Sequence, residues 1–168
     1  MSQRMLEILS GIGKAISASH TRPNNADAYT ALDVVGTSPA TNIEFADVSE
    51  TKGGLVAILS ASMRIDVPAI PAGLGTFRLH LYNAVPTAIA DNAAYNLPVA
   101  DRAKYLGYVE LFGAVDNGDT VWLQVSGVNL VCKLASESTA LYGILQTLGA
   151  YTPTAQAVKT ITLNVAAV

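Results

Sequence analysis

The chain has 168 residues, of which 51% are hydrophobic and only 14% are charged, and its formal net charge is −3. Its Lys and Arg residues are scattered along the sequence, which argues against tight nucleic-acid binding, because that needs clustered basic side chains. Ordinary soluble domains carry about 25% charged residues. Either another subunit covers part of this surface, or alanine, which tolerates exposure, accounts for the excess of hydrophobic residues.

Residues 1–12 are expected to form an N-terminal arm that contributes to assembly more than to folding. Four apolar residues share one helical stripe in this arm and form the expected assembly interface: Met5, Leu6, Leu9 and Ile12. A helix of about two turns is unstable by itself. The stripe must therefore dock on its own domain or on a neighbouring chain, and we favour the neighbour. Arg4 and Glu7 interrupt the apolar stretch, which lacks the length and the cleavage site of a signal peptide.

Residues 13–168 are expected to form a single β-sandwich domain. Between residues 55 and 67 every odd position is apolar, which predicts a long strand with its odd side chains in a core. Similar patterns predict strands near 43–48, 76–82, 107–115, 120–126 and 159–166. Residues 13–19 are expected to be an extended first strand, and residues 128–134 to continue the strand over 120–126. Residues 140–151 are ambiguous between helix and strand, and we assign them to a strand because two glycines weaken a helix there.

The turn and proline positions agree with this division into strands. All seven prolines fall between the predicted strands, as expected for a residue that cannot donate to a ladder. The run Asp116-Asn117-Gly118-Asp119 predicts a tight turn, and residues 84–104 form a long excursion with a helical turn near its end. Eight or so strands with long connections favour an all-β antiparallel sandwich or jelly roll over a simple meander.

The sequence contains no recognisable catalytic, cofactor-binding or metal-binding motif, so we expect no enzyme and no cofactor. One cysteine and two histidines without paired spacing do not form a zinc site, and Cys132 is expected in the core, in phase with Leu130 and Leu134. His80 is expected to be a hydrogen-bonded surface or interface residue. Four aspartates near turns are either turn-capping residues or calcium ligands, and we favour capping: Asp91, Asp101, Asp116 and Asp119.

Several aromatic residues could form a platform on which a sugar ring stacks, or could simply be packing residues of the sheets. They are Tyr82, Tyr95, Tyr105, Tyr108 and Trp122. No uninterrupted apolar run approaches the roughly eighteen residues of a membrane span, so we expect no membrane partner and synthesis in a host cytoplasm.

Four segments resemble a family of small virion proteins of tailed bacteriophages: 29–36 (YTALDVVG), 77–83 (FRLHLYN), 86–95 (PTAIADNAAY) and 101–107 (DRAKYLG). They lie within positions 20–110, while the N-terminal arm and the final third match only in general character. The resemblance implies a capsid decoration (cement) protein with a jelly-roll-like sandwich and no enzymatic site. Its implied partners are the major capsid protein and itself, as a dimer or trimer, and its implied location is the capsid surface of the virion.

A cement protein is physically consistent with this composition, because it bridges capsomers by shape and buried area and needs little charge. The alternative function from another class is a carbohydrate-binding or receptor-binding β-sandwich of a virion fibre. Clustered exposed aromatic residues with convergent Asp and Asn would indicate the sugar binder, whereas a broad apolar patch and an ordered terminal arm would indicate the cement protein.

Overall fold

The computed structural model describes residues 13–168, which fold into an antiparallel all-β structure. Their strands are β1 (Gly13–Thr21), β2 (Ile43–Phe45), β3 (Leu55–Ile65), β4 (Phe77–Tyr82), β5 (Tyr105–Asp116), β6 (Val121–Lys133), β7 (Leu141–Thr147) and β8 (Val158–Ala167), with one 3-10 turn, η1 (Val99–Asp101). The predicted all-β fold is confirmed, including the strand assignments of 13–19 and 140–151 and the helical turn in the 84–104 excursion. All prolines in this part of the chain lie outside the strands.

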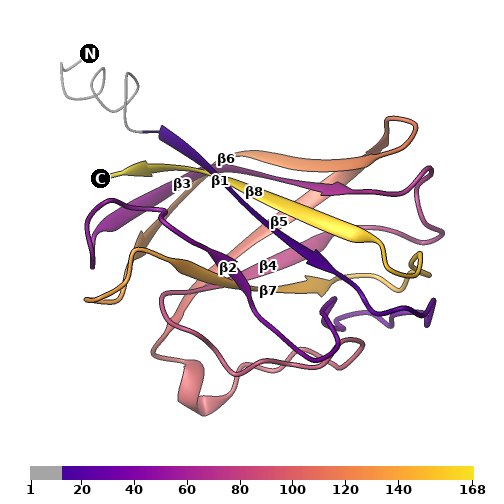
Figure 1. Ribbon diagram of the computed structural model, residues 1–168, viewed down its shortest axis with the longest axis horizontal. Helices are drawn as coiled ribbons and strands as arrows, with labels where there is room; N and C mark the ends of the chain where they lie inside the picture. The colour runs from indigo at the N-terminus through magenta and orange to yellow at the C-terminus, as the bar shows by residue number, and fades with distance from the viewer. Residues whose placement is uncertain (1–12) are drawn as a thin grey trace.

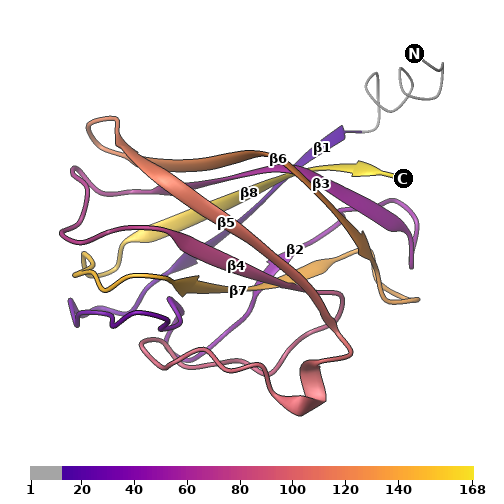
Figure 2. The same cartoon turned by 180° about the vertical axis from the view of Figure 1, so that it is seen from behind.

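The strand order identifies the sandwich as a jelly roll. The hydrogen-bonded order is β1-β8-β3-β6-β5-β4-β7-β2, so one layer is β1-β8-β3-β6 and the other is β5-β4-β7-β2. This is the order of an eight-stranded double Greek key. Figure 1 shows the two layers above and below each other, with β5 running obliquely between them, and Figure 2 shows the same arrangement from behind.

Strand β5 links the layers because its two halves pair with different neighbours. Its first half pairs with β4, and residues 112–116 pair with β6. The register with β6 shifts between Phe112 and Val115, where Gly113 has a φ of 70°. That left-handed conformation costs glycine little, so the sequence allows the strand to bend here.

The core lies between the layers and contains the inward side chains of both sheets. Its largest apolar members include Phe45, Phe77, Ile58, Met63 and Leu111, all with no more than 1% exposure. Cys132 is fully buried, as expected, and burial raises the pKa of its thiol to about 11. This cysteine is therefore a small core residue and not a reactive thiol.

One prediction about the core is wrong, because strand β3 carries a bulge at Leu59. Before the bulge Val56 and Ile58 face the core, and after it the odd positions from Ala61 to Ile65 do. The register with β8 runs from Ile58–Val165 to Ser60–Asn164, which leaves Leu59 as the extra residue. The odd positions 55, 57 and 59 therefore do not lie in the core, and Leu55 and Leu59 are exposed.

Predicted strand ends also changed. The strand expected over 43–48 ends at Phe45, and the one expected over 55–67 ends at Ile65. Segments 120–126 and 128–134 form the single strand β6, in which Gly127 has a φ of 70° and the inward phase changes from Val125 to Val128.

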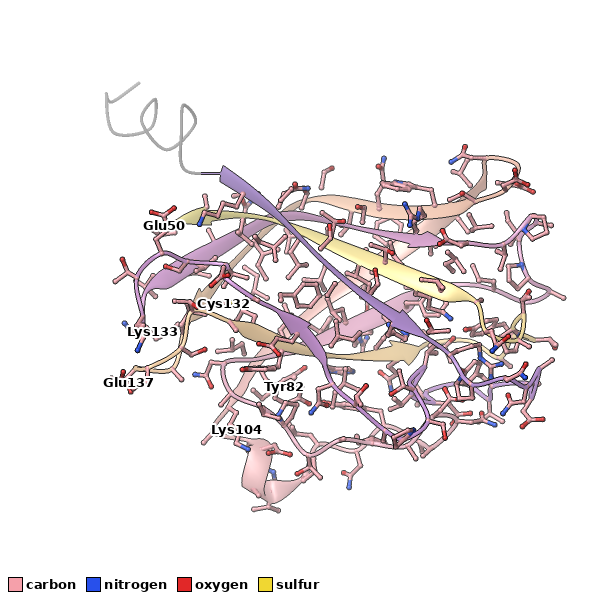
Figure 3. All side chains as sticks on the ribbon, viewed as in Figure 1. Glu50, Tyr82, Lys104, Cys132, Lys133 and Glu137 are labelled. Carbon is pink, nitrogen blue, oxygen red and sulfur yellow. The ribbon has the colours of Figure 1, made fainter. Side chains whose placement is uncertain are left out.

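The long segment 83–104 covers the outer face of the β5-β4-β7-β2 layer. A second small apolar cluster forms beneath it from Val34, Tyr82 and Ile144, with Tyr95 and Leu97 packed against them. Figure 3 labels Tyr82 on this side of the lower layer. Among residues 13–168, no segment builds a comparable cluster on the outer face of the β1-β8-β3-β6 layer.

Within residues 13–168, no helix has both the length and the apolar character that a membrane crossing requires.

Candidate functional site

The outer face of the β1-β8-β3-β6 layer, extended by the end of β5, is the surface best suited to contact another protein. We call it the open face. Register and burial place these side chains on it: Ala15, Ser17, Ser19, Thr21, Ala57, Ser60, Ser62, Arg64, Phe112, Val115, Trp122, Gln124, Ser126, Val131, Thr160, Thr162 and Asn164. These residues are mostly small and hydroxylated, and the charges of the face are Arg64 and, at its margin in the same phase as Val131, Lys133.

The hydroxyl groups of the open face bond mainly to each other. Ser17 and Thr162 share a hydroxyl–hydroxyl bond of 2.8 Å, and so do Ser19 and Thr160. Asn164 donates its side-chain amide to the Ser60 hydroxyl at 2.9 Å. Polar groups that already have partners lose less when water is removed, so this face can be buried at a low desolvation cost.

The end of the open face where β5 meets β6 is apolar. Phe112 is 50% exposed and Val115 53%, whereas Val131, 54% exposed, lies at the other end of β6. Trp122 lies between Arg64 of β3 and Val115 of β5 in the strand register. Exposed apolar side chains that occur together on one face mark a protein interaction surface more often than scattered ones do.

The charge of Arg64 is neutralised at the end of the open face. Its Nε lies 2.8 Å from Asp66 Oδ1. Lys133 lies at the opposite margin, where its ammonium donates to the Gly53 carbonyl at 2.5 Å. A surface with few charges, of which Arg64 is paired with a carboxylate and Lys133 is hydrogen-bonded to a carbonyl, fits a protein partner better than a phosphate backbone.

The aromatic residues considered for sugar stacking do not form an open platform. Tyr82 and Tyr95 share a hydroxyl–hydroxyl bond of 2.7 Å, and Tyr95 stacks on His80 with the ring centroids 3.7 Å apart. Tyr108 is 49% exposed, but Arg78 covers its ring with a centroid distance of 4.2 Å. Trp122 lies on the other sheet. Four of the five aromatic residues thus gather around one histidine as packing residues, with one face of Tyr95 against His80 and one face of Tyr108 against Arg78.

His80 is the centre of this packing and is more buried than expected. It faces away from the core, as predicted, but is only 4% exposed because the 83–104 segment covers it. Its Nδ1 lies 3.1 Å from the Tyr105 hydroxyl and its Nε2 lies 3.0 Å from Gln146 Oε1. Burial, with a smaller contribution from the charge of Arg78, lowers the pKa of His80 to about 4, so its ring is neutral at pH 7.

A buried charged cluster, which the sequence analysis did not identify, lies near the end of β1. Arg22 is fully buried and contacts Asp91 at 3.6 Å, while Tyr29 donates to Asp91 at 2.5 Å. Lys159 is 1% exposed, and burial, together with the charge of Arg22, lowers its pKa to about 8. The sequence contained one signal of this cluster, since Lys159 is in phase with the inward residues of β8.

His20 lies near the end of β1 with its side chain facing inward, and it is 9% exposed. Burial, followed by the charge of Lys159, lowers the pKa of His20 to about 3, and its interaction with the Val35 backbone acts in the opposite direction. Neither ring nitrogen makes a hydrogen bond of good geometry with the described residues. His20 is therefore an uncharged buried group and has no metal-binding neighbour set, because residues 13–168 contain no cluster of three His, Cys, Asp or Glu side chains.

Three of the four aspartates near turns stabilise backbone or side-chain groups in the way that the capping interpretation predicts. Asp116 accepts from the Gly118 amide at 2.8 Å, and Asp91 accepts from the Gly36 amide at 2.9 Å. Asp101 accepts from the Thr87 amide and from Lys104, each at 2.8 Å. The Lys104 contact, followed by Thr87, lowers the pKa of Asp101 to about 2.

The expected assembly residues Met5, Leu6, Leu9 and Ile12 lie outside the described residues, and the open face was not identified from the sequence. Its signal was present as alternating hydroxylated residues in 15–21 and 160–164, which lie opposite the apolar positions of the same strands.

No protein-family model matches the chain, and no curated protein sequence matches it. Among solved structures, it is similar to a chain of the Triatoma virus empty capsid, with 13% identity, a TM-score of 0.34, and coverage of 98% of this chain and 90% of that one. A Maize Chlorotic Mottle Virus chain gives 10% identity, a TM-score of 0.34 and 94% coverage of both chains. A bacterial lipoprotein from Bacteroides thetaiotaomicron gives 8% identity and a TM-score of 0.31, with coverage of 91% of this chain and 84% of that one. These values are too low to transfer a function, which is argued below from the chain's own residues.

Proposed function

We propose that this chain is a viral structural protein, a bacteriophage head decoration (cement) protein that binds and stabilises the capsid shell as a homo-oligomer. The open face carries the proposal, because four of its hydroxyl groups are bonded in pairs and it holds little charge, with Arg64 paired to Asp66. Such a surface is suited to burial against another protein. The resemblance of residues 29–36, 77–83, 86–95 and 101–107 to tailed-phage virion proteins supports the same function.

The size of the open face agrees with a docking role that needs a second contact. Five strands about 4.8 Å apart, with four rows of outward side chains about 7 Å apart, give an area on the order of 600 Å². A standard interface buries about 800 Å² on each partner. The proposed arm, residues 1–12 with its stripe of Met5, Leu6, Leu9 and Ile12, would supply the remaining area. In this proposal the arm precedes a single sandwich domain, residues 13–168.

The proposal places the protein on the capsid surface, in contact with the major capsid protein, and assigns it no enzymatic activity. The sugar-binding alternative receives less support, because Tyr95 stacks on His80 and Arg78 covers Tyr108. A sugar stacks on an accessible aromatic face, and one face of each of these two rings is already in contact with a neighbouring side chain.

The proposal is tested by adding the purified protein to phage heads that lack it and measuring binding and shell stability. We expect saturable binding and a higher temperature of shell disruption. Ser62→Glu places a charge in the centre of the open face and should weaken binding by about tenfold or more, since an unpaired charge would be buried. Ser136→Glu, on an exposed turn, is the matched control and should bind normally. Equal binding of both variants, or binding to glycans and not to heads, would contradict the proposal.

Deletion of residues 1–12 tests the arm separately. We expect the truncated protein to keep its melting temperature and to lose affinity for the shell, because the arm is proposed to contact a partner and not its own core. Burial of an apolar stripe stabilises by about 25 cal/mol per Å², which amounts to several kcal/mol before ordering costs. Differential scanning calorimetry and head binding measure the two effects. A large fall in melting temperature with binding intact would show that the arm belongs to the domain.

A further inference from the structure

Among residues 13–168, strand β1 lies at one edge of the sheet, and no strand of this part of the chain pairs with its outward backbone groups. Its neighbour on one side is β8, and the strand order places no strand on its other side. The Arg22 amide donates to the Ala157 carbonyl at 3.3 Å, which continues the β1–β8 register by one residue. Backbone N–H and C=O groups point to opposite sides of a strand at successive residues. Since Arg22, an even-numbered residue, bonds towards β8, the other even residues of β1 also bond to β8. The odd residues point their N–H and C=O groups outwards: Gly13, Ala15, Ser17, Ser19 and Thr21.

A bond on the other side of β8 gives the same assignment independently. The Asp66 amide donates to the Val158 carbonyl at 3.0 Å, so the even residues of β8 bond to β3. The odd residues of β8 are then left for β1. In the register these odd residues pair with even residues of β1, such as Leu163 with Ile16.

Strand β1 lacks the features that protect sheet edges from pairing with other chains. It has nine residues, no proline and an uninterrupted register, and its one lysine is at its start. That lysine, Lys14, is bound to Glu50 at 3.1 Å, and Figure 3 shows Glu50 beside the start of β1. The opposite edge strand, β2, has only three residues and carries Glu44. Natural proteins usually keep edge strands short, charged or bulged, so β1 is suited to accept another strand.

There is space beside this edge at both ends of β1. A hollow of about 560 Å³ lies between residues 18–21 of β1 and residues 37–44, with His20 and Asn42 in its wall. Another of about 210 Å³ adjoins Lys14 and the 48–51 turn. Both hollows are bounded on their far side by segments of the same chain, and β2 lies close to β1, so an approaching strand has room at the two ends of the edge.

We propose that β1 pairs antiparallel with β1 of a second copy of this chain, about a two-fold axis at Ser17. The inference deepens the proposed function, since it names the contact that makes the homo-oligomer. In this register Ser17 faces Ser17 of the other copy, and Ala15 faces Ser19. All outward pairs are small and uncharged. Each Lys14 faces a neutral His20, so no like charges meet.

The pairing also enlarges the surface proposed to bind the shell. Two sheets joined through β1 become one continuous sheet, so the two open faces lie side by side. Their joint area is on the order of 1,200 Å², above the roughly 800 Å² per partner of a standard interface. A dimer can therefore bury a standard-sized surface where a single copy falls short.

The decisive variant is Ser17→Pro. It removes an amide that points away from β8, so the β1–β8 ladder keeps its bonds while the centre of the new pairing is lost. Sedimentation and light scattering at micromolar concentration should show a dimer for the unaltered protein and an association at least about tenfold weaker for Ser17→Pro. Ser17→Ala, which loses the hydroxyl bond to Thr162 but keeps the amide, is the matched control and should dimerise normally.

Two further measurements keep the test decisive. If Ser17→Pro fails to fold, Ser17→Lys replaces it, since it places two like charges in contact on the axis and should dissociate the dimer, with a smaller effect at high salt. Amide exchange of Ala15, Ser17 and Ser19 should slow as protein concentration rises.

A monomer at all concentrations, or a Ser17→Pro dimer of normal affinity, would overturn the β1 pairing. A dimer that Ser17→Pro and deletion of residues 1–12 both dissociate would also overturn it, because the arm of the second copy would then be the occupant of the edge. In each of these cases binding to phage heads is measured separately, so the proposed function can stand when the pairing fails. Loss of head binding by Ser62→Glu alone leaves the pairing unaffected.

Discussion

Asp91→Asn is expected to destabilise the protein by about 3–5 kcal/mol, the usual cost of removing one partner of a buried ion pair. Arg22 is fully buried against Asp91 at 3.6 Å, and the carboxylate also accepts from Tyr29 at 2.5 Å. Lys159 is 1% exposed, and its pKa shows that the Asp91 charge stabilises it while the Arg22 charge opposes it. The amide would leave two buried cations without a counter-charge. Urea unfolding at pH 7 measures the loss.

Two variants separate charge from packing in this cluster. Asp27→Asn changes an exposed carboxylate of the same connection and should leave stability within about 0.5 kcal/mol of the original. Lys159→Met removes one buried cation at similar volume and should stabilise by about 2–3 kcal/mol, because charging this group in the core is unfavourable. It should also recover part of the loss in the double variant. A mild effect of Asp91→Asn, with no coupling to Lys159, would show that the three charges act independently.

Acidification should destabilise the protein well above the pH at which its carboxylates titrate. Burial lowers the pKa of His20 to about 3 and that of His80 to about 4, both below the value of 6.5 for an exposed histidine. At pH values between the lowered pKa of each folded histidine and 6.5, the unfolded chain binds more protons than the folded one. Stability therefore falls as pH falls below about 6.5. Each histidine contributes about 1.4 kcal/mol per pH unit, and the two together should cost about 4 kcal/mol at pH 5.

The pH profile of urea unfolding, with His20→Leu as the test variant, measures this effect. The variant should halve the slope between pH 6.5 and 5, because His80 alone then titrates in that range. Asp101 does not interfere, since its lowered pKa of about 2 places its contribution below pH 4, where stability is lost as the carboxylate is protonated. A flat profile down to pH 5 would show that the two rings are accessible to protons in the folded state.

The strands illustrate how much local sequence determines. Alternating side chains in 76–82, 107–115 and 159–166 identified three strands to within two residues at most of their ends, because an apolar face every second residue is a local property. Prolines marked the connections for an equally local reason. Cys132 was assigned to the core from its phase with its neighbours, and its complete burial agrees.

The bulge at Leu59 shows where local pattern fails. The segment 55–67 has an unbroken odd-position alternation, yet the core contains Val56 and Ile58 before the bulge and Ala61 after it. Because Val56 and Ile58 are also apolar, either the odd or the even residues of 55–59 could have faced the core. The choice depended on pairing with β8, which is about one hundred residues away in the chain.

The candidate surface depends almost entirely on such distant pairing. The sequence by itself determined an all-β chain, poor in charge, with hydroxylated residues at alternate positions of its first and last strands. Only the tertiary structure brought β1 beside β8 and joined Ser17 to Thr162 across 145 residues. It also covered one sheet with residues 83–104, left the other uncovered by described residues, and placed β1 at the edge. A side chain's phase is fixed by its neighbours in sequence, whereas its partners and its exposure are fixed by which strands meet, and that depends on the packing of the whole chain.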